Sequence, residues 1–216
     1  ILVSLALNFQ TFVFEAGNDL PYILYLPSYA ATAHYHSRLE NPPNNLETFL
    51  SEVREFAIDD YAPALLKGSS ISASEKMRIA NRLAAYTGLD SSFIADLNLR
   101  IPYMLFAKSV LGQFGYTVGR LDSRYVGADL DPDAARAQRD PSYDAPHGAY
   151  AAAINDYLRR DLQVETTKSY TVLSRKVNES WSWEHDKKLG YINTADALRK
   201  ALIVNPHLKV LIANGI

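Results

Sequence analysis

Two apolar segments, one at each end of the chain, constrain the fold more than any other feature of the sequence. Residues 1–7 and 208–213 are almost entirely aliphatic, which is typical of strands buried on both faces of a parallel sheet. Such strands need partners on both sides. We therefore expect Leu2–Leu7 and Lys209–Ala213 to be parallel strands of one sheet, and the chain to be an internal fragment of a larger fold.

Helix start and stop signals recur between these two segments. Asp19 is expected to cap a helix over Leu20–Leu39, with Pro21 in its first turn and a kink at Pro27. The other expected helices are Leu46–Lys67, bent or divided at Pro63; one from the capping box at Ser72 to Thr87; one capped by Asp90 and running through Asn98; one from Pro102 to near Gly112 or Gly115; Ala149–Leu162; and one capped by Asn193 and ending at Val204.

Three further segments lack helical signals. Tyr116–Tyr125 is expected to be extended, Gly127–Pro146 to be a loop rich in Asp, Ala and Pro, and Ser169–Leu173 to be a short strand. A strand, a long helical excursion and a second strand of the same sheet outline an α/β fold with an inserted helical cap. The expected boundaries are 1–40 and 190–216 for pieces of the core, and 41–189 for the cap.

Composition excludes several classes of function. The formal net charge is −2, so no basic field favours nucleic acid or anionic lipid, and no apolar run approaches the roughly 20 residues that span a membrane. The chain has no cysteine, which excludes disulfides, thiolate metal sites and cysteine nucleophiles. It also has no phosphate loop, dinucleotide fingerprint or metalloprotease motif, and we expect neither a metal nor a cofactor.

The chain also lacks a nucleophile elbow, in which small residues flank a serine on a strained turn between a strand and a helix. The nearest match is Gly68–Ser72, where a serine replaces the second glycine and caps the next helix. We therefore expect no catalytic residue within the chain. If a serine did react, Ser123 and Ser28 would be the first to test.

Other polar residues have both a functional and a structural interpretation. His34 and His36 are two residues apart, so they do not share a helix face and make a poor metal site. Arg120 and Arg124, around Asp122, fit either a charge-paired turn or recognition of a carboxylate. The triplet at 184–186, Glu-His-Asp, is either a small acid–base site or an ordinary surface loop.

Several segments, in order along the chain, resemble bacterial members of the serine carboxypeptidase family, in the α/β-hydrolase class. They are Leu7–Thr11, Gly17–Pro27, Tyr29–Ala33, Tyr35–His36, Tyr61–Gly68, Thr117–Arg124, Asn155–Arg160 and Asn205–Gly215. Plant and yeast members carry disulfides around the cap, so the absence of cysteine favours the bacterial branch.

The resemblance implies a serine-type carboxypeptidase that releases C-terminal residues from peptides, in the periplasm or outside the cell, with its catalytic triad outside this chain. It also implies that aromatic residues from the first helix help to wall the substrate pocket. Tyr22, Tyr25 and Tyr29 fall at helical spacing there, and plain packing of an amphipathic helix is the alternative. Acyl transfer or a lyase reaction on the same scaffold, or a non-catalytic helical binding module, remain alternatives. The separated chain is expected to expose its outer strand edges and the face of the Leu20–Leu39 helix, and therefore to self-associate or to be ordered only beside the missing flanks.

Overall fold

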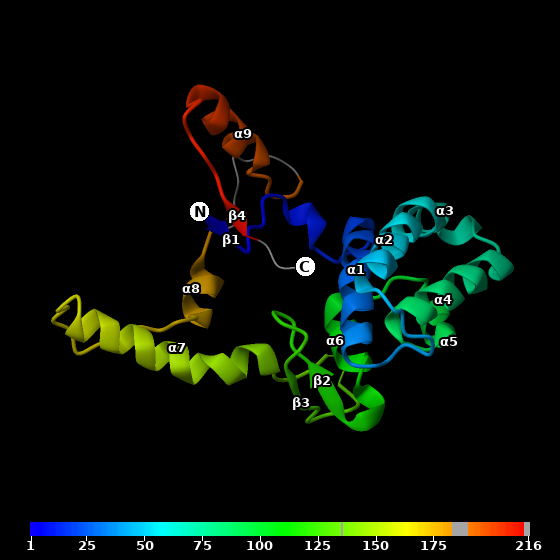
Figure 1. Ribbon diagram of the computed structural model, residues 1–216, viewed down its shortest axis with the longest axis horizontal. Helices are drawn as coiled ribbons and strands as arrows, with labels where there is room; N and C mark the ends of the chain where they lie inside the picture. The colour runs from blue at the N-terminus through cyan, green and yellow to red at the C-terminus, as the bar shows by residue number, and fades with distance from the viewer. Residues whose placement is uncertain (135, 183–189, 214–216) are drawn as a thin grey trace.

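The computed structural model describes residues 1–134, 136–182 and 190–213. This described part of the chain is mixed α/β and mainly helical, with two small sheets (Figure 1). The strands are β1 (Leu2–Val3), β2 (Tyr116–Val118), β3 (Val126–Ala128) and β4 (Ile212–Ala213). The helices are α1 (Leu20–Tyr35), α2 (Leu46–Phe56), α3 (Ala62–Lys67), α4 (Ala73–Thr87), α5 (Ser91–Asp96), α6 (Tyr103–Ser109), α7 (Pro141–Arg160), α8 (Arg175–Ser180) and α9 (Ala195–Val204). Single turns lie at η1 (Phe9–Thr11), η2 (Ala57–Tyr61), η3 (Gly68–Ser70) and η4 (Gly112–Phe114).

The two ends of the described chain pair as parallel strands, as the sequence predicts. Leu2 of β1 is in register with Ile212 of β4, and the N–H of Leu2 donates to the carbonyl of Leu211 at 2.8 Å. Each strand has only two residues, however, and Val3 and Ile212 are exposed. The expectation of strands buried on both faces is therefore wrong for the described residues, because two strands alone cannot cover each other's faces.

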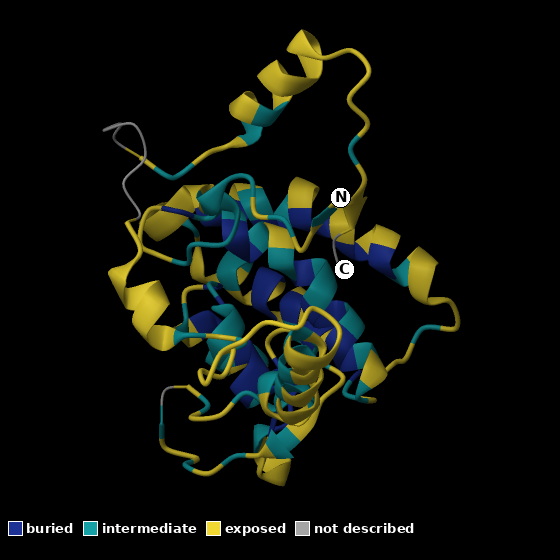
Figure 2. Ribbon diagram, turned by 90° about the vertical axis from the view of Figure 1, so that its left-hand side faces the viewer, coloured by how far each residue is buried: buried dark blue, intermediate teal, exposed yellow. Residues whose placement is uncertain are grey.

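Helices α1 to α6 and the β2–β3 hairpin form one compact unit, here called the helical body (residues 18–128). Its core is continuous, and α1 packs on α2 and α4 inside it. Figure 2 shows the buried residues gathered there. The largest fully buried side chains include Leu26, Leu65, Ile79, Leu83 and Ile94. This core combines α1, from the expected core piece 1–40, with residues of the expected cap up to Val118.

Local chemistry determines where several helices of the body begin and end. The Ser72 hydroxyl accepts the N–H of Glu75 at 3.2 Å, and the Asp90 carboxylate accepts the N–H of Phe93 at 2.9 Å, which confirms both predicted caps. Gly88 ends α4 with a left-handed φ of 68°. A β-carbon at this position would lie 2.7 Å from the carbonyl oxygen of Arg38, so the close approach also requires glycine.

The predicted helix over Leu46–Lys67 is divided, as the proline within it suggests. A five-residue π-type turn, η2, separates α2 from α3 just before Pro63. Proline has no N–H to donate, and its ring clashes with the carbonyl four residues earlier, here that of Asp59. A wider turn relieves this clash without ending the helical path.

Two expectations for the first long helix are wrong. Asp19 makes no capping hydrogen bond, because its carboxylate pairs with Arg100 instead. The helix ends at Tyr35 and not at Leu39, because Ser37 adopts a left-handed φ of 53° and the N–H of Arg38 turns back to the carbonyl of Ala33 at 2.8 Å.

The segment after the hairpin is more regular than predicted. The expected loop over Gly127–Pro146 contains most of β3 at its start and the first turns of α7 at its end. Asp140 caps α7 by accepting the N–H of Ser142 at 3.0 Å, so the helix begins eight residues before the predicted Ala149 and includes Pro146.

The strand predicted over Ser169–Leu173 is also wrong. Tyr170 there donates its N–H to the side chain of Asn155 on α7, at 2.7 Å, and this bond takes the place of a strand partner. Asn193 accepts the N–H of Ala195 at 3.0 Å, as expected of a residue that starts a helix, although Thr194 occupies the cap position itself.

Residues 141–182 and 190–213 form a second region, here called the C-terminal arm. Helix α7 extends away from the helical body, and α9 lies near β1 and β4 (Figure 1). Helices α8 and α9 have no buried residue, and in α7 only Ser142 is buried. The arm therefore has helices without a core of its own among the described residues.

Candidate functional site

The three tyrosines predicted to line a substrate pocket lie together on one face of α1. Phe14 joins them, with its ring centroid 4.9 Å from that of Tyr22 and 5.1 Å from that of Tyr25. Tyr103 at the start of α6 closes the cluster, 6.1 Å from Tyr25. Edge-on and tilted contacts of this kind are favourable arrangements of aromatic rings. The face of α1 is thus an aromatic cluster between α1 and α6.

The three tyrosines differ in what they expose. Tyr22 and Tyr29 are buried, whereas Tyr25 is only partly buried. The ring of Tyr29 stacks on that of Phe106, with the ring centroids 4.1 Å apart. The Tyr29 hydroxyl donates a hydrogen bond to the carbonyl of Ile101 at 3.1 Å. Packing therefore accounts for Tyr22 and Tyr29. Of the three tyrosines, only Tyr25 has a side chain accessible enough to contact a ligand.

Tyr29 and a fourth tyrosine, Tyr61, hold the link between α5 and α6. The Tyr61 hydroxyl donates to the carbonyl of Leu99 at 2.6 Å, two residues from the Tyr29 contact. Burial raises the pKa of both phenols well above the ordinary value, since an ionised phenol loses its hydration there. Both groups consequently stay protonated and act as hydrogen-bond donors.

An ion pair fastens the same link to the start of α1. Arg100 places its Nε and one terminal nitrogen on the two carboxylate oxygens of Asp19, each at 2.7 Å, and also donates to the carbonyl of Leu65 at 3.2 Å. Bidentate pairing is the strongest geometry for arginine and carboxylate. The sequence analysis missed this pair because 81 positions separate the two residues, and no local pattern links them.

Ser123, the first serine to test for reactivity, lies beside His36 but is not activated by it. The His36 Nε2 atom lies 2.6 Å from the backbone carbonyl of Ser123, and not on the hydroxyl. That hydroxyl meets the Thr32 hydroxyl at 2.7 Å, and Thr32 donates its own proton to the carbonyl of Ser28. Ser123 therefore donates to Thr32, which is a structural role and not that of a nucleophile paired with a base.

The two arginines near Asp122 already have carboxylate partners. Arg124 binds Asp122 at 2.7 Å, and Arg120 binds Asp140 at 2.8 Å. The hydrogen bond from Arg124 lowers the pKa of the Asp122 carboxyl. These contacts favour the charge-paired turn over the recognition of an external carboxylate, because a ligand would have to displace an existing partner.

The other polar candidates do not form a site in the described part of the chain. There, no three histidine, aspartate or glutamate side chains gather closely enough to hold a metal ion, and this covers His34 and His36. Gly68–Ser72 forms a short turn and a helix cap. The triplet at 184–186 lies outside the described residues, as do residues 214 and 215 at the end of the segment Asn205–Gly215.

No protein-family model, no curated protein and no solved structure matches this chain. Within the described residues, no helix is both long enough and apolar enough to cross a membrane.

Proposed function

We propose that the chain is part of a serine-type carboxypeptidase of the α/β-hydrolase class, with the catalytic triad outside this sequence. One observation carries the proposal: β1 and β4 pair in parallel, although a long and mainly helical segment separates them. In α/β folds, two parallel strands joined through helices belong to one sheet, and an insertion between them can cover the catalytic edge. The segment resemblances along the chain agree in order with this arrangement.

In this proposal residues 41–128 of the helical body belong to the cap over the active site, and they pack on α1, which lies in the core piece 1–40. The continuous core that they share with α1 would keep the cap rigid while it closes one side of a peptide-binding cleft. Tyr25 would contact the C-terminal side chain of the substrate, with Tyr22 and Tyr29 supporting it from behind. The peptide is the only partner that the proposal requires, and acyl transfer or a lyase reaction on the same scaffold would use the same contacts.

A second candidate is a helical binding module without catalysis. The observation in its favour is the continuous core of the helical body, which does not depend on β1 or β4. The exposed edges of these strands argue against it, because a finished binding module seldom leaves such edges uncovered.

The proposal is tested with a fluorophosphonate probe on two samples, the protein encoded by the complete gene and the present chain alone. We expect stoichiometric labelling and release of C-terminal residues from a blocked dipeptide with the complete protein only. Labelling of Ser123 or Ser28 in the present chain would contradict it, and an unlabelled complete protein that binds peptides would favour the binding module.

The role of Tyr25 is tested in the complete protein with Tyr25→Ala. We expect the preference among C-terminal side chains to change by about 1–3 kcal/mol, the usual scale of discrimination in apolar pockets, while turnover persists. Tyr35→Ala is the matched control, since Tyr35 is an exposed tyrosine at the end of the same helix. Equal kcat/KM ratios for the two variants across substrates would leave Tyr25 as a packing residue.

A further inference from the structure

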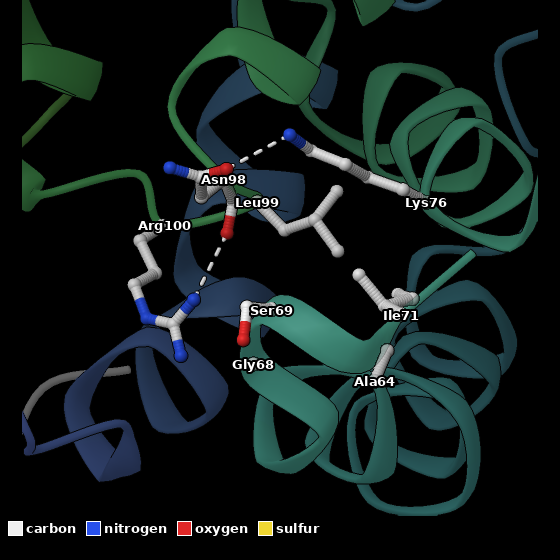
Figure 3. A pocket seen from close by; sticks show the side chains of 8 residues that line it. All are labelled: Ala64, Gly68, Ser69, Ile71, Lys76, Asn98, Leu99 and Arg100. Carbon is white, nitrogen blue, oxygen red and sulfur yellow. Dashed lines mark hydrogen bonds between the residues drawn. The ribbon is translucent and has the colours of Figure 1, made fainter. Parts of the chain in front are cut away.

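A pocket of about 230 Å³ lies on the helical body, and Tyr22, Tyr25 and Tyr29 are not among its lining residues (Figure 3). It is bounded by the end of α3, the start of α4 and the link between α5 and α6. Ala64, Ile71 and Leu99 give it an apolar lining, and Ala64 and Leu99 are buried. Lys76 and Arg100 are its two cationic residues. The lining therefore combines an apolar surface with positive charge and contains no acidic residue.

Lys76 and Arg100 both donate hydrogen bonds to Asn98, which has an unusual backbone conformation. Asn98 and Leu99 are consecutive non-glycine residues with left-handed φ angles of 51° and 67°. Such residues are uncommon, and they recur at sites that bind ligands. In this conformation the side-chain oxygen of Asn98 accepts from Lys76 Nζ at 2.8 Å, and its carbonyl accepts from Arg100 at 3.1 Å (Figure 3).

The two cations differ in how far their charge is compensated. Asp19 neutralises Arg100 through two hydrogen bonds of 2.7 Å. Lys76 contacts only the neutral amide of Asn98, and among the described residues no carboxylate lies within ion-pair distance of it. The nearby Glu75 is paired with Lys67 at 2.6 Å. The pocket thus carries about one uncompensated positive charge, with two remaining N–H donors on Lys76.

We propose that this pocket binds a small monocarboxylate with a branched apolar side group. Lys76 and the Ser69 hydroxyl would donate to the carboxylate, and the side group would lie against Ala64, Ile71 and Leu99. A single uncompensated charge matches one carboxylate better than a dianion, and the apolar lining selects against a bare inorganic ion. Tyr25 does not line this pocket, and ligand binding here does not depend on the proposed peptidase activity.

The test titrates the 216-residue chain with isovalerate and follows backbone amide shifts by NMR. Isovaleramide, which has the same shape without the charge, and sulfate, which has charge without the side group, are the comparison ligands. The variants are Lys76→Gln, Lys76→Arg and Lys67→Gln. Lys67→Gln is the matched control, because it removes the same charge from a neighbouring residue that does not line the pocket.

We expect saturable shifts at Ser69, Ile71 and Asn98 with isovalerate. Lys76→Gln should weaken its binding about tenfold, as for loss of a charge-assisted hydrogen bond, whereas Lys76→Arg and Lys67→Gln should stay within about threefold. Isovaleramide or sulfate binding as tightly as isovalerate would overturn the proposal. So would an equal effect of the two glutamine variants, or shifts confined to other parts of the chain.

Discussion

The helical body and the C-terminal arm are both rich in apolar residues, but only the body buries them. Every buried hydrophobic residue of the described chain lies between Tyr22 and Val118. The arm instead exposes aromatic and aliphatic side chains, among them Tyr150, Trp181 and Val204. The same residue types are therefore buried in one region and exposed in the other. Tertiary contacts, and not residue type, determine which.

The arm shows how far helices form from local interactions. Asp140 and Ser174 cap α7 and α8, and Arg175 pairs with Glu179 one turn along α8 at 2.6 Å. Each contact of this kind contributes a few tenths of a kcal/mol to about 1 kcal/mol, and helices of ordinary length rely mainly on packing of an apolar face. Helices α8 and α9 have no buried residue, so local contacts account for a larger share of their stability than in the helices of the body.

The largest effect should come from a core truncation in the body. Leu65→Ala should lower the free energy of unfolding by about 2–5 kcal/mol, because Leu65 is 2% exposed and its loss leaves a cavity. The adjacent Leu66, 83% exposed on the same helix, is the control, and Leu66→Ala should change stability by less than about 0.5 kcal/mol. Urea denaturation measures both.

Leu202→Ala extends this test to the arm, where Leu202 is exposed on α9. We expect a loss of about 1 kcal/mol, smaller than that of Leu65→Ala, because Leu202 is already 38% exposed in the folded chain. A loss as large as that of Leu65→Ala would mean that the arm has a core after all, and the contrast between the regions would fail.

Alkaline pH should destabilise the body through its buried phenols. Tyr29 and Tyr61 have folded-state pKa values above the unfolded value of about 10, so their contribution is complete below pH 10 and is lost as pH rises above it. Each should reduce stability by about 1.4 kcal/mol per pH unit above 10. Tyr61→Phe should make the slope shallower in urea titrations from pH 9 to 11, and an unchanged slope would contradict the burial of Tyr61.

A smaller effect is expected from one hydrogen bond in the body. Tyr29→Phe removes the donor to the carbonyl of Ile101 and should cost about 1 kcal/mol of unfolding free energy. Tyr35→Phe is the control, since Tyr35 is exposed, and it should leave the denaturation midpoint unchanged. Equal midpoints for the two variants would show that the Tyr29 contact does not stabilise the link between α5 and α6.

The smallest effect on stability should come from a substitution on the surface of the arm. The same substitution should nevertheless change self-association of the chain. Ile203→Lys should alter the free energy of unfolding by less than about 0.5 kcal/mol yet lower self-association of the isolated chain in sedimentation velocity. Ile203 is 65% exposed on α9, and Ile58, 66% exposed on the body, is its matched control. If Ile58→Lys lowers self-association equally, the surface of the arm is not the one through which the chains associate.

Part of the fold follows from local sequence signals. Ser72 and Asp90 mark helix starts, Gly88 marks a helix end, and Pro63 follows the division of a long helix, because each acts through bonds within a few residues. The wrong expectations have long-range or competing causes. The Asp19 carboxylate pairs with Arg100 and therefore does not cap α1 as expected. No pattern near Ser169–Leu173 indicated the hydrogen bond from Tyr170 to Asn155.

The site divides in the same way. The sequence alone determined that Tyr22, Tyr25 and Tyr29 share a helix face, because the helical period is local. Only the tertiary structure decided that Tyr29 is buried on Phe106 while Tyr25 keeps an open surface, since this depends on where α6 packs. Likewise, the sequence indicated two strands at the chain ends, but the burial of a strand depends on neighbours, and the described chain leaves both strands exposed.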